Sequence, residues 1–333
     1  MIVVTGAAGF IGSNIVAALN ARGRSDVVAV DFFGPRPPAR PLPRRPAYLD
    51  GMPLAQRVDA WDLPAWLEQR GGEVQAIIHM GACSDTTQAD RAFITAVNTD
   101  YTRTLWQWCT SAGRPLIYAS SAATYGDGSA GYDDRVDPGM YRPLNLYGQS
   151  KQDFDLWALA QSAGPARWAG LKFFNVYGPR EGHKGRMASV AFHACNQILQ
   201  TGKVRLFQSH RPDFPDGGQK RDFIYVADAV AVTLHFLDTP ASAAAPNGLY
   251  NVGTGKARTF ADLVRAVFAA MGRPANIEYF PMPQDLRGKY QYFTQAEPTK
   301  LRQAGFTRVM HDVETGVAEY VRFLQAGGEE AKP

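Results

Sequence analysis

The sequence begins Met1-Ile-Val-Val-Thr-Gly-Ala-Ala-Gly-Phe-Ile-Gly12, and this stretch predicts its architecture more strongly than any other. The short, β-branched segment up to Thr5 is typical of a buried strand, and the apolar periodicity of residues 11–19 is typical of a helix. Glycines at positions 6, 9 and 12 allow a tight turn between them, at which the backbone can approach a pyrophosphate at the helix N-terminus. Gly6, Gly9, Gly12 and the downstream Asp31 therefore predict a dinucleotide site.

The rest of the chain continues this alternation of strands and helices. Further apolar runs at residues 27–30, 76–79, 116–119, 168–173 and 249–252 are typical of buried strands, with helical patterns between them at about 93–109 and 147–159. The run 222–228 leads into another helical pattern at 229–237. Such runs indicate an α/β fold, a Rossmann-type doubly wound parallel sheet with helices on both faces. We expect a dinucleotide-binding domain of residues 1–178 plus about 221–255, and a smaller, discontinuous substrate-binding domain of about 179–220 plus 256–333.

The choice of cofactor stays open at this point. A carboxylate at Asp31 suits the free 2′-hydroxyl of NAD, whereas Arg36 and Arg40, in the Pro/Arg-rich stretch 34–46, suit the 2′-phosphate of NADP. We expect NADP, with NAD as the alternative.

Composition narrows the class of protein. Hydrophobic residues make up 45% and charged residues 20% of the 333, which is typical of a globular protein and not of a disordered one. A net charge of +4 is too weak to indicate a nucleic-acid partner. No apolar run approaches the length of a membrane span, and Gly6 interrupts the N-terminal apolar stretch, so we expect neither a membrane partner nor a signal peptide. Three cysteines without metal-type spacing predict reduced thiols in the cytoplasm and no metal site.

Three residues have the chemistry of proton transfer. Ser121 follows the strand through Tyr118, and Tyr147 and Lys151 are four residues apart, which places their side chains on one face of a helix. A tyrosine with its ordinary pKa near 10 is a poor base at neutral pH, but a nearby ammonium favours the phenolate. Ser121 can hydrogen-bond the same substrate oxygen. We call Ser121, Tyr147 and Lys151 the proton-transfer triplet.

By its glycine turn and this triplet, the chain resembles the extended short-chain dehydrogenase/reductase family, whose members mostly act on nucleotide-linked sugars. The runs 173–185, 187–193, 221–223 and 289–295 resemble, within it, the ADP-glyceromanno-heptose 6-epimerases. The resemblance implies interconversion of the D-glycero and L-glycero epimers of ADP-manno-heptose, a lipopolysaccharide core precursor. It also implies a homo-oligomer, a pentamer.

The resemblance assigns further roles, residue by residue. Lys184, one of only nine lysines against 26 arginines, is implied as a second acid/base group; the other interpretations are a solvated lysine or a phosphate contact. The positions implied to hold the ADP-sugar are Ser121, Asn175, Lys184, Arg186, His193, Phe207, Arg221 and Tyr290. The positions implied to hold the cofactor, besides those above, are Phe10, Ile11, Phe32, Gly81, Ala82, Cys83, Asn98, Tyr147, Lys151 and Val176. His193 is equally well explained as a structural histidine on a helix.

Three other functions were compared with the sequence. A 4,6-dehydratase needs an acidic pair where Ala122 and Ala123 stand, which argues against that activity. A UDP-hexose 4-epimerase has the same fold, and the run 181–185 is the main difference from it. An inactive NAD(P)-binding regulatory module is the third alternative, although it would have no need of the triplet.

Overall fold

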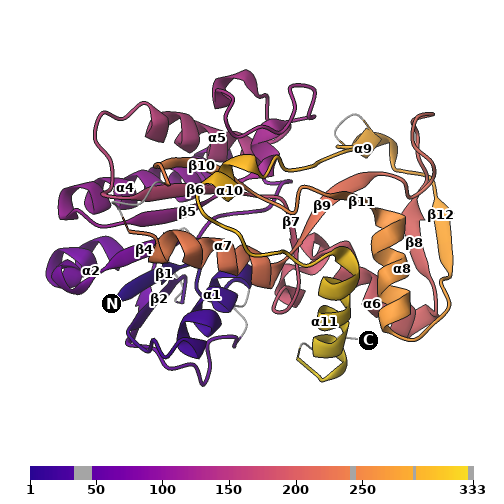
Figure 1. The fold of residues 1–333 in the computed structure, drawn as a ribbon, viewed down its shortest axis with the longest axis horizontal. Helices are drawn as coiled ribbons and strands as arrows, with labels where there is room; N and C mark the ends of the chain where they lie inside the picture. The colour runs from indigo at the N-terminus through magenta and orange to yellow at the C-terminus, as the bar shows by residue number, and fades with distance from the viewer. Residues whose placement is uncertain (34–46, 241–244, 288–289, 329–333) are drawn as a thin grey trace.

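The computed structural model describes residues 1–33, 47–240, 245–287 and 290–328. Its centre is an all-parallel sheet of seven strands (Figure 1). In their order across the sheet these are β10 (Gly248–Val252), β6 (Trp168–Phe173), β5 (Leu116–Ser121), β4 (Ala76–His79), β1 (Ile2–Thr5), β2 (Val27–Asp31) and β3 (Gln56–Asp59). The predicted doubly wound parallel sheet is therefore confirmed.

Side chains of neighbouring residues in a strand point to opposite faces of the sheet, so both faces carry side chains that pack against other elements. Helices cover both of these faces. Val4 and Ile78 pack on the side of α1 (Phe10–Ala21), and α7 (Val226–Asp238) lies beside α1. Val3 and Ile77 pack on the opposite side. That side is covered by α2 (Leu63–Arg70), α4 (Tyr101–Ala112) and α5 (Leu146–Leu159). Every residue of β1, β2 and β4 is buried, which explains their continuous apolar sequences.

Smaller elements lie to the right of this sheet in Figure 1. One sheet has the order β11 (Ala257–Thr259), β9 (Lys220–Tyr225), β7 (Asn175–Tyr177), and the other pairs β12 (Ile277–Phe280) with β8 (Val204–Phe207). Helix α8 (Phe260–Ala270) packs against α6 (Val190–Thr201) and α11 (Val313–Gln325). The short elements are η1 (Gly71–Glu73), α3 (Arg91–Ile94), η2 (Thr95–Asp100), η3 (Ala122–Tyr125), η4 (Pro138–Met140), η5 (Gly182–Met187), α9 (Gln284–Arg287) and α10 (Thr299–Gln303).

The structure differs from the sequence-based expectation in three places. The single helix expected over 93–109 is divided into α3, the π-helical η2 and α4. The short strands β3, β7, β8, β11 and β12 are not among those expected, because at least half of the residues in each are only partly buried or exposed and their sequences lack a continuous apolar run. Strand β9, although it leads into α7 as expected, pairs in the small sheet and not in the seven-stranded one. The division into two domains stays a prediction.

Three further features concern the described residues as a whole. None of their helices has both the length and the apolar character needed to cross a bilayer. No group of three or more His, Cys, Asp or Glu side chains in the described ranges is arranged to hold a metal ion. Cys83, Cys109 and Cys195 are all free thiols.

Candidate active site

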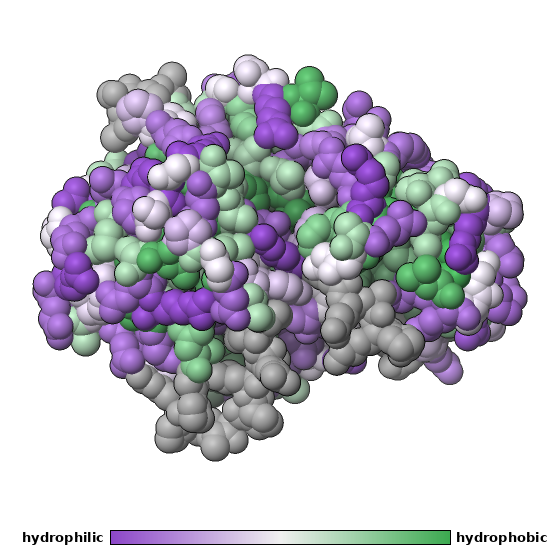
Figure 2. Space-filling model, turned by 90° about the horizontal axis from the view of Figure 1, so that it is seen from below, coloured by the Kyte–Doolittle hydropathy of each residue, from purple (hydrophilic) through white to green (hydrophobic). Residues whose placement is uncertain are grey.

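A cavity of about 550 Å³ lies at the carboxyl ends of the strands β1, β2, β4, β5 and β6. This is the edge at which open parallel sheets bind ligands. The face drawn in Figure 2 is hollowed near the middle, with hydrophilic and apolar side chains interleaved around the hollow. Of the residues predicted from sequence, the cavity is lined by Gly6, Gly9, Phe10, Ile11, Gly12, Asp31, Phe32, Gly81, Ala82, Ser121, Tyr147, Lys151, Asn175, Val176, Lys184, Arg221 and Tyr290.

The glycine turn has the close packing that a pyrophosphate cradle needs. Gly6 has a φ of +63°, and a Cβ there would lie 2.7 Å from the backbone nitrogen of Gly81. A Cβ at Gly12 would lie only 2.0 Å from the Gly6 carbonyl oxygen. Gly9, the N-cap of α1, supplies no side-chain cap, so the helix N-terminus is open toward the cavity that Gly9 and Phe10 line. These residues fit a dinucleotide cofactor.

Asp31 is held rigidly at the end of β2. Its carboxylate accepts hydrogen bonds from the backbone N–H of Ala8, at 2.9 Å, and of Phe32, at 2.8 Å. The ring of Phe32 lies 5.3 Å from that of Trp61, which also lines the cavity. Arg36 and Arg40, on which the choice between NAD and NADP depends, lie outside the described residues.

Cys83 and Asn98 are not among the lining residues, but they support that wall. The Asn98 side chain accepts from the Cys83 N–H at 2.8 Å and donates to the Cys83 carbonyl at 3.0 Å. Cys83 stands between Ala82 and Ser84, which both line the cavity. Asn98 therefore shapes the loop after β4 through backbone contacts.

The structure brings the proton-transfer triplet together at one side of the cavity. Ser121 is the last residue of β5, and its side chain shares a hydrogen bond with the Tyr147 phenol. Burial raises the pKa of Tyr147 above its usual value, and the hydrogen bond with Ser121 opposes that rise. Lys151 donates to the Ala119 carbonyl at 2.8 Å, and burial lowers its pKa to about 8. Tyr147 and Lys151 share one face of α5, which begins at Leu146 with its Asn145 cap accepting from the Gly148 N–H.

Lys184 is held by two groups in the turn η5. Its Nζ lies 3.5 Å from a carboxylate oxygen of Glu181 and 4.8 Å from the centre of the Phe10 ring. Glu181 is fully buried and also accepts from the N–H and the hydroxyl of Ser189, at 2.7 and 2.6 Å. The Lys184 side chain is 24% exposed and lines the cavity. An amine in this place can meet a bound substrate or a phosphate.

Arg221, on β9, places a buried cation in the wall of the cavity. It is 6% exposed, and its guanidinium lies 5.3 Å from the Tyr290 ring and 5.4 Å from the Phe260 ring. It donates to the backbone carbonyls of Lys220 and Gln291. Among the described residues no carboxylate neutralises it, and burial lowers its pKa. A buried guanidinium without a carboxylate is suited to a phosphate ligand.

Three residues predicted to contact substrate are not among those that line the cavity. Phe207 packs edge-to-face on Tyr290, with 6.1 Å between ring centres, and so supports the cavity wall. Arg186 is 71% exposed and donates to the Thr87 hydroxyl. His193 lies partly buried on α6 with its ring against Phe192. The roles of all three stay predictions.

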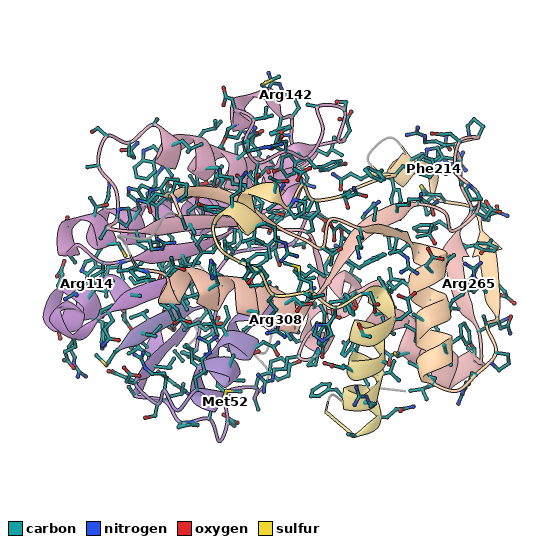
Figure 3. All side chains as sticks on the ribbon, in the orientation of Figure 1. Met52, Arg114, Arg142, Phe214, Arg265 and Arg308 are labelled. Carbon is teal, nitrogen blue, oxygen red and sulfur yellow. The ribbon has the colours of Figure 1, made fainter. Side chains whose placement is uncertain are left out.

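Other lining residues were not predicted as site residues. Trp61 and Ala60 directly follow β3, and Tyr101 begins α4 and donates to the Ala60 carbonyl at 2.8 Å. The position of Trp61 just after a strand end is the signal that could have indicated it, had β3 been recognised. His183, Met187, Phe223 and Phe260 also line the cavity. Residues 211–218 do not line the cavity, but they contact its wall through a chain of aromatic rings. Phe214, labelled in Figure 3, packs on Tyr292, which packs on the lining residue Tyr290.

Comparison with known proteins agrees with this geometry. Residues 2–253 match the model of the NAD dependent epimerase/dehydratase family. The chain is 50% identical to an ADP-L-glycero-D-manno-heptose-6-epimerase of Nitratidesulfovibrio vulgaris, over 99% of each chain. It is 44% identical to the enzyme of that name from Fusobacterium nucleatum, over 97% of each chain.

Among solved structures, the crystal structure of the Helicobacter pylori ADP-L-glycero-D-manno-heptose-6-epimerase is similar. The match has a TM-score of 0.77 at 26% identity and covers 98% of this chain and 96% of the other. The matched family is NAD-dependent by its description, which agrees with the glycine turn. The chain therefore belongs to the NAD dependent epimerase/dehydratase family and, within it, to the group of the ADP-L-glycero-D-manno-heptose-6-epimerases.

Proposed function

We propose that this protein is an isomerase that interconverts ADP-D-glycero-β-D-manno-heptose and ADP-L-glycero-β-D-manno-heptose at the sixth carbon of the sugar. One observation carries the proposal: a single cavity joins the glycine turn, the proton-transfer triplet, Lys184 and the buried cation Arg221. The choice of substrate rests on the relatives named for this activity, which are 44% and 50% identical over nearly the whole chain.

The cofactor supplies reversible hydride transfer at the sixth carbon, and the residues of this chain handle the protons. Tyr147 takes the hydroxyl proton as that carbon becomes a ketone, while Ser121 hydrogen-bonds the same oxygen. Lys151 remains a cation beside Tyr147 and so favours its phenolate. Because the sixth carbon lies outside the sugar ring, rotation about the bond to the ring presents the other face of the ketone. Lys184 then protonates the oxygen in its second orientation, and the carbinol is restored with inverted configuration.

The proposal is tested by incubating the purified protein with ADP-D-glycero-manno-heptose without added reductant. Nuclear magnetic resonance of the sixth carbon is expected to show the L-glycero epimer, with no net change in the redox state of the cofactor. A 4-keto-6-deoxy product, or no reaction with this sugar, would overturn the assignment. A UDP-hexose is incubated in a separate reaction, and its epimerisation at the fourth carbon in place of the heptose reaction would favour the UDP-hexose 4-epimerase.

For the cofactor we propose NADP. The carboxylate of Asp31 is bonded by two backbone N–H groups, and Arg36 and Arg40 follow it closely in sequence. Replacing both arginines with alanine is expected to weaken NADP⁺ binding about tenfold or more, because each loses a charge-assisted contact with the 2′-phosphate. Binding of NAD⁺ is expected to stay unchanged, as is binding of both cofactors to Arg22→Ala, whose exposed ion pair with Asp238 lies elsewhere. Titration by fluorescence measures both; tighter binding of NAD⁺ by the unmodified protein would contradict the choice of NADP.

For the substrate we propose that Arg221 binds the pyrophosphate of the ADP-sugar. Arg221→Gln removes the charge but keeps a polar side chain, and it is expected to raise KM about 10- to 100-fold, with a smaller effect on kcat. Steady-state kinetics with the ADP-heptose measure this. Arg265→Gln is the matched control, since Arg265 is exposed on α8 (Figure 3). An unchanged KM in Arg221→Gln would place the pyrophosphate elsewhere.

We further propose that the protein works in the cytoplasm, as a homopentamer, and supplies a precursor of lipopolysaccharide. The support is the resemblance to the epimerase group, together with three cysteines that form no disulfide. Native mass spectrometry measures the assembly, and any state other than five copies would contradict the pentamer.

A further inference from the structure

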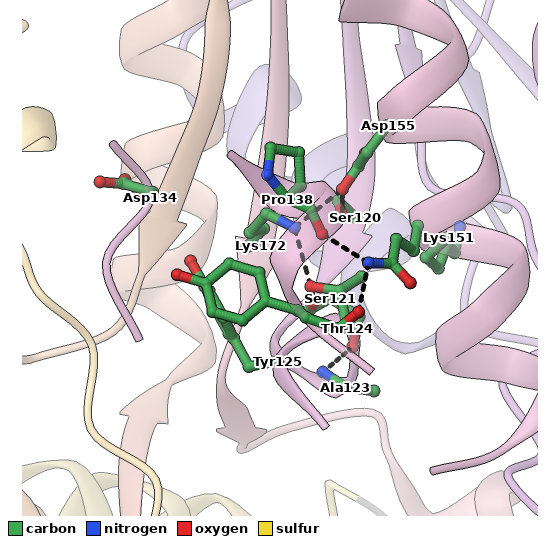
Figure 4. A network of polar contacts seen from close by, with 12 residues as sticks. Ser120, Ser121, Ala123, Thr124, Tyr125, Asp134, Pro138, Lys151, Asp155 and Lys172 are labelled. Carbon is green, nitrogen blue, oxygen red and sulfur yellow. Dashed lines mark hydrogen bonds and ion pairs between the residues drawn. The ribbon is translucent and has the colours of Figure 1, made fainter. Parts of the chain in front are cut away.

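A buried polar network lies behind the proton-transfer triplet (Figure 4). Its centre is Asp155, on α5, which accepts a hydrogen bond from the Ser120 hydroxyl at 2.6 Å and from the Tyr118 hydroxyl at 3.0 Å. Asp155 also forms an ion pair with Lys172 of β6, with 2.9 Å between Nζ and the carboxylate oxygen. The side chain of Lys172 is 1% exposed and that of Asp155 is 0% exposed.

The network joins three elements at the level of the triplet. In the parallel pairing of β5 and β6, Ser120 stands opposite Lys172, one residue before Ser121. Tyr147, Lys151 and Asp155 follow one another at intervals of four residues, so they share one face of α5. The network thus contacts β5 next to Ser121 and contacts α5 one turn beyond Lys151.

Lys172 is satisfied on its other side as well. Its ammonium donates to the Thr124 hydroxyl at 2.7 Å and lies 5.2 Å from the centre of the Tyr125 ring. The remaining residues of β6 are apolar or glycine, and all are buried. An apolar pair could fill the same space without the cost of removing two charges from water. Packing alone therefore does not require an ion pair at this place.

We infer that Asp155 and Lys172 are positioning residues for the proton transfer, which clamp α5 to β5 and β6 and keep the net charge behind Tyr147 and Lys151 at zero. The inference rests on the proposed function, because proton transfer by Tyr147 is the step that this charge balance serves. Neither residue lines the cavity, so both act through the triplet.

The charge balance matters because Asp155 acts on both titrating groups. Its negative charge raises the pKa of Lys151, against the burial that lowers it to about 8, and it also raises the pKa of Tyr147. Several titratable groups face this region from the surrounding elements: His79 and Cys83 on and after β4, Tyr118 on β5, Tyr125 on η3, Asp134 and Tyr141 on either side of η4, Tyr147, Lys151 and Asp155 on α5, Lys172 on β6, and Lys300 on α10. Among these, Asp155 and Lys172 form the ion pair.

The two single variants are therefore expected to act with opposite sign. Lys172→Met leaves the Asp155 charge unbalanced, so the pKa values of Tyr147 and Lys151 rise and the profile of kcat/KM against pH moves to higher pH. Asp155→Asn leaves the ammonium of Lys172 unbalanced, so both pKa values fall and the profile moves to lower pH. Each displacement is expected to be about half a pH unit or more. The double variant is expected to lie between them, near the parental profile.

The control is Lys203→Met, which makes the same chemical change in an exposed ion pair with Glu278. It is expected to keep the parental profile. If Asp155 and Lys172 served packing alone, both single variants would lose activity while the shape and position of the profile stayed the same. That result, or displacements of equal sign, would overturn the inference.

A second measurement does not depend on turnover. Ultraviolet difference absorbance between each protein and its Tyr147→Phe counterpart, recorded with NADP⁺ bound, isolates the ionisation of the Tyr147 phenol. The same opposite displacements are expected in its midpoint. If the unmodified protein fails to epimerise the sugar, the proposed function fails, while this ionisation still supports or overturns the charge balance. Near-ultraviolet circular dichroism shows whether each variant is folded.

Discussion

Replacing Tyr147 with phenylalanine is expected to lower kcat for the interconversion about 100- to 10,000-fold, because the cavity loses the group that takes the hydroxyl proton. Phenylalanine keeps the ring and its packing on α5, and the hydroxyl alone disappears. The glycine turn and Lys151 are unaffected, so binding of the dinucleotide is expected to stay unchanged. Nuclear magnetic resonance of the sugar measures turnover, and cofactor fluorescence measures binding.

The matched control for this change is Tyr279→Phe. Tyr279 lies on β12, 36% exposed, outside the residues that line the cavity. It is expected to keep the parental rate. Near-parental turnover in Tyr147→Phe would show that another group takes the proton, and the assignment of the proton-transfer triplet would then be wrong.

Replacing Lys184 with methionine is expected to produce a loss of similar size, because protonation of the ketone oxygen in its second orientation then lacks a donor. A second substitution separates proton transfer from simple contact. Lys184→Arg keeps a positive charge next to Glu181 and Phe10, but a guanidinium does not give up its proton in proteins. Arginine is therefore expected to be nearly as inactive as methionine, while both variants bind the dinucleotide.

The outcome for Lys184→Arg decides between the two roles. If arginine restores most of the turnover, Lys184 is a charged contact to the substrate or to a phosphate and not an acid. If methionine itself keeps near-parental turnover, the scheme with two acid/base groups is wrong, although the substrate assignment stands. Lys203→Met, in the exposed pair with Glu278, is the matched control.

Most of the fold could be predicted because six of the seven strands of the main sheet are almost entirely buried. The runs that become β1, β2, β4, β5, β6 and β10 are continuous and apolar, and that pattern is visible without a structure. The strands β3 and β12 lie at sheet edges with most of their residues partly exposed, so they carry no such pattern. The change from α-helix to π-helix after Ile94 is likewise not marked by a proline or a glycine in the sequence.

The cavity residues likewise divide into those that the local sequence predicts and those that it does not. Gly6, Gly9 and Gly12, like Tyr147 and Lys151, are neighbours within one turn or one helix face, and their spacing along the chain alone predicts that they meet. The aromatic pair Phe32 and Trp61 forms because β2 and β3 end side by side, and β3 lacks the apolar run that would have marked the strand before Trp61.

Local order along the chain thus predicts the nucleotide turn, the strand that ends at Ser121 and the helix that presents Tyr147 and Lys151, because turns and helices are made by residues close in sequence. The pairing of Asp155 with Lys172, 17 residues away, depends on the docking of α5 onto β5 and β6. The burial of Arg221 without a carboxylate depends on β9 meeting the segment at Tyr290. These contacts arise only when distant segments pack together, and packing between distant segments leaves no periodic trace in the sequence.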